Sequence, residues 1–262
     1  MPNPPPSAPI VCMFACLSDN YGYLIHHPAS NSTISIDSPD AETILNIAAS
    51  KGWNITHILN THWHADHAGG NAKIQEATGC RIFGPQEVNS RLQAPLDDVL
   101  TGGETLNFGD LSIEVLSTPG HTLEHISYYI PILDAAFVGD TMFALGCGRM
   151  FEGNPEMFWN SLKKIRALPD TTKIYCAHEY TLANLKFTES IDAENEDLKA
   201  YAKTLRELRA DQQPTIPALL GKEKQTNPFL RADSTQMINL LNMQGKSPID
   251  VFAHIRKMKD NF

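Results

Sequence analysis

The sequence is short of three features that mark other classes of protein. No apolar run approaches the ~20 residues that are needed to cross a bilayer. The five cysteines are odd in number, widely spaced and without a C-x-x-C pair, which predicts reduced thiols rather than a disulfide framework. The net charge of −9 argues against a nucleic-acid partner, because phosphate binding depends on clustered Lys and Arg. We therefore expect an ordinary cytoplasmic globular protein.

Three parts are expected along the 262 residues. Residues 1–9 are rich in proline and have no basic region, which predicts a disordered lead-in rather than a secretory signal. Residues 10–180 alternate short β-type runs with turns, whereas residues 181–262 show only helical periodicity. The first 180 residues hold 9 basic and 19 acidic side chains and the rest hold 12 and 11, so the helical part has cations for a small anionic substrate.

The hydrophobic pattern predicts sheets covered by helices, an α/β or α+β layer structure. Strands are expected at residues 10–16, 21–27, 33–36, 57–60, 81–83, 111–117, 126–130, 136–139 and 173–176. Helices are expected at residues 41–51 and 71–78, after Asn154-Pro155, on the stripe from Leu198 to Leu208, and after Ser247-Pro248. Residues 101–104 and 108–110 are expected to form hairpin turns, and no strand is expected after Tyr180.

The run Thr61-His62-Trp63-His64-Ala65-Asp66-His67 is the most informative motif of the chain. Alternate side chains of an extended segment share a face, so His62 and His64 are expected to project together. Asp66 and His67 follow where the chain turns. Imidazole and carboxylate groups are the usual ligands of zinc and similar metals, and bulk folding does not require three histidines within six residues. The run therefore predicts a metal site.

Three further candidate ligands stand at the ends of expected strands. His121 lies in a Thr-Pro-Gly-His-Thr turn, Asp140 in a Gly-Asp-Thr turn, and His178 in a Cys-Ala-His-Glu-Tyr segment. A single histidine after a strand is more often structural, but three such positions downstream of a four-ligand cluster favour a two-metal site, which needs about seven or eight protein ligands.

The other five histidines are given structural interpretations. His26, His27 and His254 are expected on the surface, and His57 is expected to be structural. His125 follows His121 by four residues, so either a structural role or the orientation of a ligand fits it.

Together the four motifs resemble the metallo-β-lactamase superfamily: T-H-x-H-x-D-H, T-P-G-H-T, G-D-T and H-E-Y. The segment Gly146-Cys147-Gly148-Arg149-Met150-Phe151-Glu152-Gly153 is similar to one of glyoxalase II, the hydroxyacylglutathione hydrolases. Residues 176–187, 227–231 and 256–262 also match that family's pattern. The resemblance extends over nearly the whole chain except the lead-in.

The resemblance implies a four-layer αββα sandwich over residues 10–180 and a helical substrate-binding domain over residues 181–262. The first metal would take His62, His64 and His121, and the second would take Asp66, His67 and His178. Asp140 would bridge the two ions. By the family's pattern, the glutathione moiety would contact Arg149, Phe151, Tyr180, Arg256 and Lys259.

Two segments depart from the family's pattern. Many members have Lys and Tyr where this chain has Arg149 and Phe151, so the charge is kept with another geometry and a hydroxyl is lost. Asp37-Ser38-Pro39-Asp40 stands where D-P-G-D is usual, and we expect that change to matter only locally.

The ligand set and the resemblance imply a thioester hydrolase. Two divalent ions, zinc first with iron or manganese as alternatives, would lower the pKa of a bridging water to about 7. The resulting hydroxide, oriented by Asp66, would attack S-D-lactoylglutathione and release glutathione and D-lactate, the second step of methylglyoxal detoxification by the glyoxalase route. Arg256 and Lys259 would hold the glycine carboxylate of glutathione, and the enzyme is expected to be a monomer.

Four alternatives fit the residues less well. A β-lactamase more often has Cys at position 140, and a ribonuclease needs a basic exosite. A mono-iron persulfide dioxygenase needs neither the seven ligands nor the helical domain. A metal-free binding module would have lost ligands, and none is lost.

Overall fold

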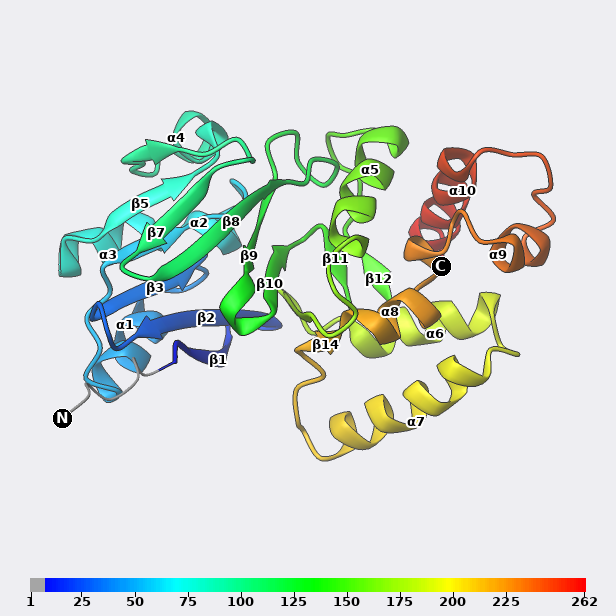
Figure 1. Cartoon of the computed structure of the whole chain (residues 1–262), viewed down its shortest axis with the longest axis horizontal. Helices are drawn as coiled ribbons and strands as arrows, with labels where there is room; N and C mark the ends of the chain where they lie inside the picture. The colour runs from blue at the N-terminus through cyan, green and yellow to red at the C-terminus, as the bar shows by residue number, and fades with distance from the viewer. Residues whose placement is uncertain (1–7) are drawn as a thin grey trace. The chain divides into compact units, whose positions relative to one another are not determined.

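A computed structural model describes residues 8–262 (Figure 1). Most of the lead-in expected over residues 1–9 therefore lies outside the described residues. The chain divides into two compact units. Unit 1 comprises residues 124–137 with the described part of residues 1–117, and unit 2 comprises residues 118–123 and 138–262. The domain boundary expected at residue 180 falls inside unit 2 and stays a prediction.

Unit 1 contains a six-stranded sheet in the order β1-β2-β3-β4-β5-β6. Its strands are β1 (Ile10–Cys16), β2 (Asn20–His27), β3 (Ser32–Ile36), β4 (His57–Leu59), β5 (Arg81–Gly84) and β6 (Asp98–Val99). The first three are antiparallel, and β3 to β6 are parallel neighbours. Parallel neighbours need crossover connections, which here contain α1 (Ala41–Ser50), α2 (Ala65–Ala68), α3 (Asn71–Thr78) and α4 (Gln86–Leu92).

Helices α1 and α3 pack on one face of this sheet. The Asp40 carboxylate caps α1 by accepting from the Thr43 backbone N–H at 3.2 Å. Ile44 of α1 and Ile74 of α3 then pack with Ile58 of β4 in one buried cluster. Full burial of each such side chain contributes about 2 kcal/mol. This core packs against β4, and the candidate site begins just after that strand.

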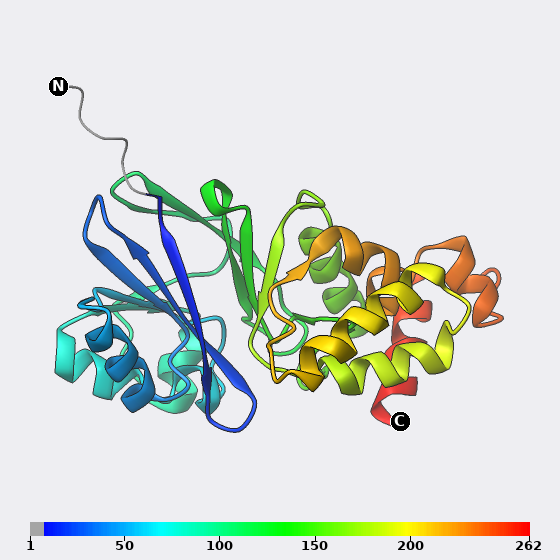
Figure 2. The ribbon, with the colours of Figure 1, turned by 90° about the horizontal axis from the view of Figure 1, so that it is seen from below.

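Unit 1 also contains antiparallel strands β7 (Thr105–Phe108), β8 (Leu111–Ser117) and β9 (Ile126–Ile130). A 3-10 turn, η1 (Pro131–Leu133), leads into β10 (Ala135–Gly139), whose first three residues pair with β9. Tyr23 of β2 meets Phe137 of β10 edge to face at 5.3 Å, which joins the two sets of strands. Unit 1 is thus layered as helices, sheet and second sheet (Figure 2).

The hairpin turn expected at residues 101–104 is wrong. This segment leaves β6, in the first sheet, and enters β7, beside β8, so it connects two sheets. Gly102 and Gly103 have φ angles of +97° and +105°, which suit a sharp change of direction as well as a hairpin. Which strands pair on either side of a turn is decided by long-range contacts, and the turn residues alone do not specify them. The turn at residues 108–110 does join β7 to β8 as predicted.

Two histidines expected on the surface are buried instead. His26 and His27 are 9% and 2% exposed, because other segments of unit 1 cover both faces of β2. The His26 ring stacks on Trp53 with centroids 4.6 Å apart, and His27 pairs with Asp110 at 2.9 Å. His254 is exposed, as predicted.

Unit 2 contains the hairpin of β11 (Met142–Phe143) and β12 (Gly146–Cys147), and the pair β13 (Lys173–Cys176) and β14 (Ala218–Leu219). Its helices are α5 (Pro155–Arg166), α6 (Thr181–Ile191), α7 (Glu196–Ala210), α8 (Leu220–Thr226), η2 (Pro228–Leu230), α9 (Thr235–Leu240) and α10 (Pro248–Asp260). The expectation of no strand after Tyr180 is wrong, since β14 lies there. The sequence could not indicate it, because a two-residue strand is too short to show a hydrophobic period. Among the described residues, none of the helices has the length and apolar character to cross a membrane.

The expected helix signals are confirmed in unit 2. Asn154 caps α5 by accepting from the Met157 N–H, and Ser247 forms a capping box with Asp250 at the start of α10. Phe158 of α5 and Phe252 of α10 meet with ring centroids 5.6 Å apart. Helix α10 is therefore docked through its apolar face.

A buried carboxyl group supports the β11–β12 hairpin from α8. Glu223 is fully buried and accepts from the Leu145 N–H at 2.8 Å and from Asn227 Nδ2 at 3.0 Å. Asn227 also donates to the carbonyl of Gly146 at 3.0 Å. Burial raises the pKa of Glu223 to about 7.

We predict that Glu223→Gln stabilises the protein at alkaline pH. The pKa of Glu223 is higher in the folded than in the unfolded chain, so the stability that its neutral form provides below pH 4.5 is lost as the pH rises through about 7. Gln stays neutral at every pH. The free energy of unfolding of the variant, relative to that of the parent, should therefore rise by about 2 kcal/mol from pH 5 to pH 8, as measured by urea unfolding. Glu207→Gln, at an exposed position of α7, is the control. A gain for Glu223→Gln that does not change with pH contradicts the prediction.

Candidate metal centre and adjoining pocket

The His62–His67 cluster begins where β4 ends, and Asp37 holds it in place. The Asp37 carboxylate accepts from the N–H of Thr61 at 2.7 Å, from its hydroxyl at 2.8 Å, and from His67 Nδ1 at 2.8 Å. This fixes the His67 tautomer and leaves Nε2 without a proton, as a metal ligand requires. The sequence analysis gave Asp37 no role of its own, because this residue is common to D-S-P-D and D-P-G-D. The sequence could have indicated this contact, because Asp37 follows β3 and Thr61 follows β4, and these two strands are parallel neighbours.

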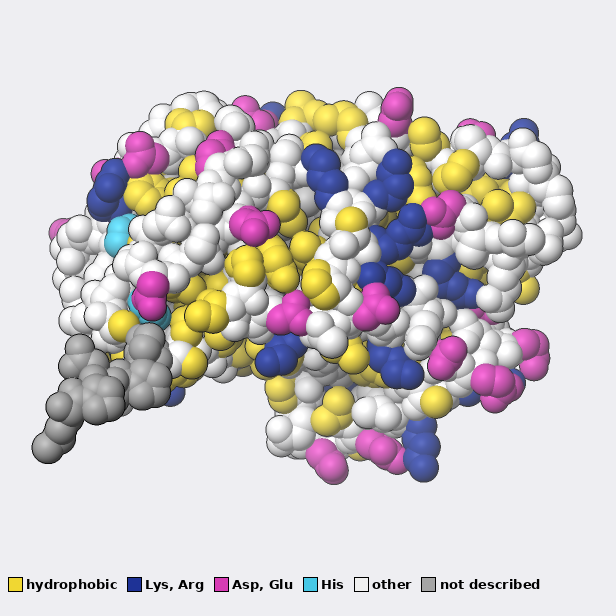
Figure 3. All heavy atoms as spheres, viewed as in Figure 1, with side chains coloured by type: hydrophobic (Ala, Val, Ile, Leu, Met, Phe, Trp, Pro, Cys, Tyr) yellow, Lys and Arg dark blue, Asp and Glu magenta, His cyan; other side chains and the backbone are white. Residues whose placement is uncertain are grey.

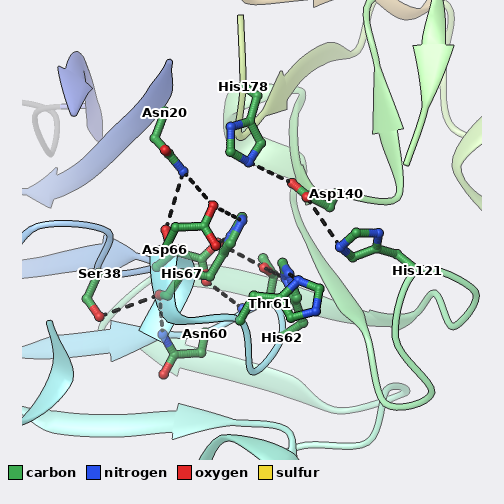
Figure 4. A network of polar contacts seen from close by, with 12 residues as sticks. Asn20, Ser38, Asn60, Thr61, His62, Asp66, His67, His121, Asp140 and His178 are labelled. Carbon is green, nitrogen blue, oxygen red and sulfur yellow. Dashed lines mark hydrogen bonds and ion pairs between the residues drawn. The ribbon is translucent and has the colours of Figure 1, made fainter. Parts of the chain in front are cut away.

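The four predicted ligands of unit 1 lie together, and Figure 4 labels three of them, His62, Asp66 and His67. His62 Nε2 and His64 Nδ1 are 2.9 Å apart, and His67 Nε2 is 3.5 Å from the Asp66 carboxylate. The rings of His62 and His67 have centroids 4.0 Å apart. Asn20, which the sequence did not single out, donates to Asp66 Oδ2 at 3.1 Å. The four ligand side chains come from one short segment, and Asn20 reaches it from β2.

Unit 1 contains two further histidines for which the sequence suggested a structural or orienting role. One of them packs against the predicted ligands and the other does not. His125 is fully buried, and its ring stacks on His62 with centroids 4.8 Å apart. It therefore restricts the tilt of that ring, which favours the orienting role over a purely structural one. His57 meets Phe108 edge to face at 4.5 Å, in keeping with a structural role.

The three predicted ligands of unit 2 also lie together (Figure 4). Asp140 follows β10 directly, and its two carboxylate oxygens lie 3.3 Å from His121 Nε2 and 3.4 Å from His178 Nε2. His121 donates through Nδ1 to the backbone carbonyl of Arg149 at 2.8 Å, which fixes its tautomer with Nε2 toward Asp140. One carboxylate between two imidazoles has the arrangement of a bridging ligand.

Two glycines allow the backbone to approach these ligands. Gly120 has a φ of +146°, and a Cβ there would lie 2.4 Å from the Phe158 ring. A Cβ on Gly148 would lie 2.0 Å from the carbonyl oxygen of Asp140. Larger residues at either position would displace the loop of His121 or the turn of Asp140.

Unit 2 also contains a cavity of about 490 Å³ beside these ligands. Both His121 and Asp140 line it. So do all five residues predicted to bind substrate, Arg149, Phe151, Tyr180, Arg256 and Lys259, and four that were not singled out, Phe143, Cys147, Ala183 and Asn184. The sequence signal for Ala183 and Asn184 was their place in the run after His178.

The cavity combines aromatic walls with positive charge. Tyr180 stacks on His178 with parallel rings 4.8 Å apart, and Phe151 lies 5.2 Å from the His121 ring. Burial, then Arg256 and Arg149, lowers the pKa of Lys259. Figure 3 shows Lys and Arg gathered over the part of unit 2 where α5, β12 and α8 lie. Such a cavity suits a small anionic ligand.

The ligand residues fit divalent metal ions by their chemistry. Five imidazoles and two carboxylates are buried or half-buried, and within each unit their donor atoms converge. Nitrogen and oxygen donors of this kind suit zinc, iron and manganese.

Known proteins match both parts of the chain. The family model of the metallo-beta-lactamase superfamily matches residues 32–178, and that of the hydroxyacylglutathione hydrolase C-terminus matches residues 179–262. A hydroxyacylglutathione hydrolase of Hyphomonas neptunium is 51% identical over 95% of this chain and 96% of its own length. One from Erythrobacter litoralis is 50% identical over 95% of this chain and 98% of its own.

Solved structures agree in fold. ETHE1 from Myxococcus xanthus superposes with a TM-score of 0.67 at 26% identity, over 95% of this chain and 90% of that chain. TTHA1623 in a di-iron-bound form has a TM-score of 0.61 at 23% identity, over 84% of this chain and all of that chain, which shows the fold alone.

The fold and the paired groups of His and Asp ligands define a protein of the metallo-β-lactamase superfamily, and the fold class expected from the sequence is confirmed. At half identity over nearly the full length of its relatives, the chain belongs to the hydroxyacylglutathione hydrolases, which confirms the family resemblance.

We predict that Asp37→Asn weakens metal binding. Without the carboxylate, the His67 ring loses its fixed tautomer, and loss of such a partner costs about 10- to 100-fold in metal affinity. Competition with a chromophoric chelator for Zn²⁺ measures the effect. Asp110→Asn is the matched control, because Asp110 also pairs with a buried histidine, His27, that is outside the predicted ligand set. Equal affinities for Asp37→Asn and the parent would contradict the role of Asp37.

Proposed function

We propose that this chain hydrolyses the thioester of S-(2-hydroxyacyl)glutathione, with S-D-lactoylglutathione as the first substrate, to give glutathione and D-lactate. The observation that supports it most is a single cavity lined by His121 and Asp140 together with three cations, Arg149, Arg256 and Lys259. The names of the half-identical relatives support the same reaction. We also propose the second step of the glyoxalase route, carried out in the cytoplasm by a monomer, with residues 10–180 and 181–262 as its domains.

We propose two divalent ions, zinc first, with iron or manganese as alternatives. By the family pattern, His62, His64 and His121 would hold one ion, Asp66, His67 and His178 the other, and Asp140 would bridge them. When bound, the ions would supply the acidity that makes water a nucleophile near neutral pH.

The residues of the chain orient the reactants. The Asp37 carboxylate and the Arg149 carbonyl hold the rings of His67 and His121, and Asp66, held by Asn20, would orient the attacking water. Cations at the cavity wall would hold the carboxylates of glutathione. The leaving thiolate belongs to a thiol of pKa about 8.5, so no strong general acid is needed.

The substrate test follows the loss of thioester absorbance. The full chain, loaded with Zn²⁺, is expected to turn over S-D-lactoylglutathione and to leave an acyl-CoA and a β-lactam almost untouched. An acyl-CoA lacks the two small carboxylates that the cations would hold. Absence of turnover with the glutathione thioester by metal-replete protein would contradict the proposal.

We predict that Lys259→Ala raises KM about tenfold or more and changes kcat much less. Lys259 lines the cavity and donates to the carbonyl of Ala183 at 3.0 Å, away from the ligand residues, so its loss should weaken ground-state and transition-state binding equally. Steady-state kinetics with S-D-lactoylglutathione measure both constants. Lys186→Ala, on neighbouring α6 outside the cavity lining, is the control. A fall in kcat at unchanged KM argues against this role.

A further inference from the structure

We propose that Arg256 and Asp260 are positioning residues for the metal ligands His121 and Asp140. They would act through residues 147–149, here called the ligand-support segment. The family's pattern implies that Arg256 contacts the substrate, and it implies no role for Asp260. The inference rests on the proposed assignment of His121 and Asp140 as metal ligands.

The guanidinium of Arg256 is occupied by protein partners. Its side chain is 5% exposed. Nη1 donates to the carbonyl of Cys147 at 2.9 Å and makes a longer contact of 3.4 Å with that of Gly148. Nε and Nη2 bind the carboxylate of Asp260 at 3.1 and 2.9 Å, and Phe229 covers one face of the group at 5.1 Å. Substrate can therefore meet only a small part of this cation.

The ligand-support segment contacts both ligands on its other side. The carbonyl of Arg149 is the acceptor for His121 Nδ1 at 2.8 Å. Gly148 packs against the backbone of Asp140, where even a Cβ atom would not fit. The carbonyl of Arg149, which orients His121, therefore lies one residue after the Gly148 carbonyl and two residues after the Cys147 carbonyl that Arg256 contacts.

Arginine is suited to this task by its shape. Its planar group presents donors in a fixed fork, so it can bind backbone carbonyls on one edge and a carboxylate on another. Lysine has a point charge on a flexible stem and cannot hold both sides at once. Asp260 fixes the rotation of the fork and balances a buried positive charge.

Asp260 separates the two possible roles of Arg256. It is 44% exposed and is not among the residues that line the cavity. Asp260→Ala keeps the cation at position 256 but frees it from its orienting partner. A cation used only for substrate should then bind substrate as well as before or better.

The experiment compares Asp260→Ala and Arg256→Lys with the parent. Zn²⁺ affinity is measured on the full chain by competition with a chromophoric chelator, and kcat and KM are measured with S-D-lactoylglutathione. We expect Zn²⁺ affinity to fall about tenfold or more in both variants, and kcat to fall as well, because the loss of groups that orient metal ligands has effects of that size. KM of Asp260→Ala should stay within about twofold of the parent value.

Asp250→Ala is the matched control for the stability of α10. Asp250 is an acid on the same helix, and its capping box with Ser247 stabilises the first turn. Its loss should lower the unfolding midpoint and leave Zn²⁺ affinity unchanged. If Asp250→Ala reproduces the loss of affinity, a general loosening of the helix replaces the positioning role.

Parent-like Zn²⁺ affinity and kcat in Asp260→Ala and Arg256→Lys would overturn the inference and leave Arg256 as a substrate cation. The chelator measurement needs no substrate. If the parent binds Zn²⁺ but does not turn over the glutathione thioester, the proposed reaction fails while the effect of Asp260→Ala on affinity still tests the positioning role.

Discussion

The proposed metal centre depends on fixing which nitrogen of each imidazole faces the ion. A neutral histidine binds a cation only through the nitrogen without a proton, so the other nitrogen needs an acceptor. Asp37 is that acceptor for His67, and the Arg149 carbonyl is that acceptor for His121. Asp37 directly follows β3, and Arg149 lies two residues after β12, so the segments that leave these strands decide the chemistry of the rings.

The sequence predicted what depends on neighbouring residues and missed what depends on distant ones. The Asn154 cap, the helix at residues 71–78 and the strand at residues 111–117 were readable from local pattern, and the density of His and Asp at residues 62–67 identified ligands. The burial of His26, the partners of residues 101–104 and the contact of Asp37 with His67 arise from strand pairing, which no local period encodes. The assignment of each ligand to the first ion, the second ion or both came from the family pattern.

The two departures from the family pattern differ in consequence. At position 149 the contact with His121 is made by the backbone carbonyl, so exchange of Lys for Arg leaves it unchanged and alters only the side-chain charge geometry. At position 151 the ring keeps its contact with His121, but no hydroxyl is present to bind substrate. The first change preserves the ligand geometry, and the second bears on glutathione affinity.

The β11–β12 hairpin is where the helical part of unit 2 supports the ligands. Asp140 precedes the hairpin and the ligand-support segment begins at its last residue. Glu223 and Asn227 hold its turn from α8, while Arg256 and Asp260 hold its end from α10. The helices therefore do more than supply cations for a substrate. Because the end of this hairpin joins Arg256 to His121 and Asp140, the geometry of these two side chains depends on where α10 holds that end, and not only on their own loops.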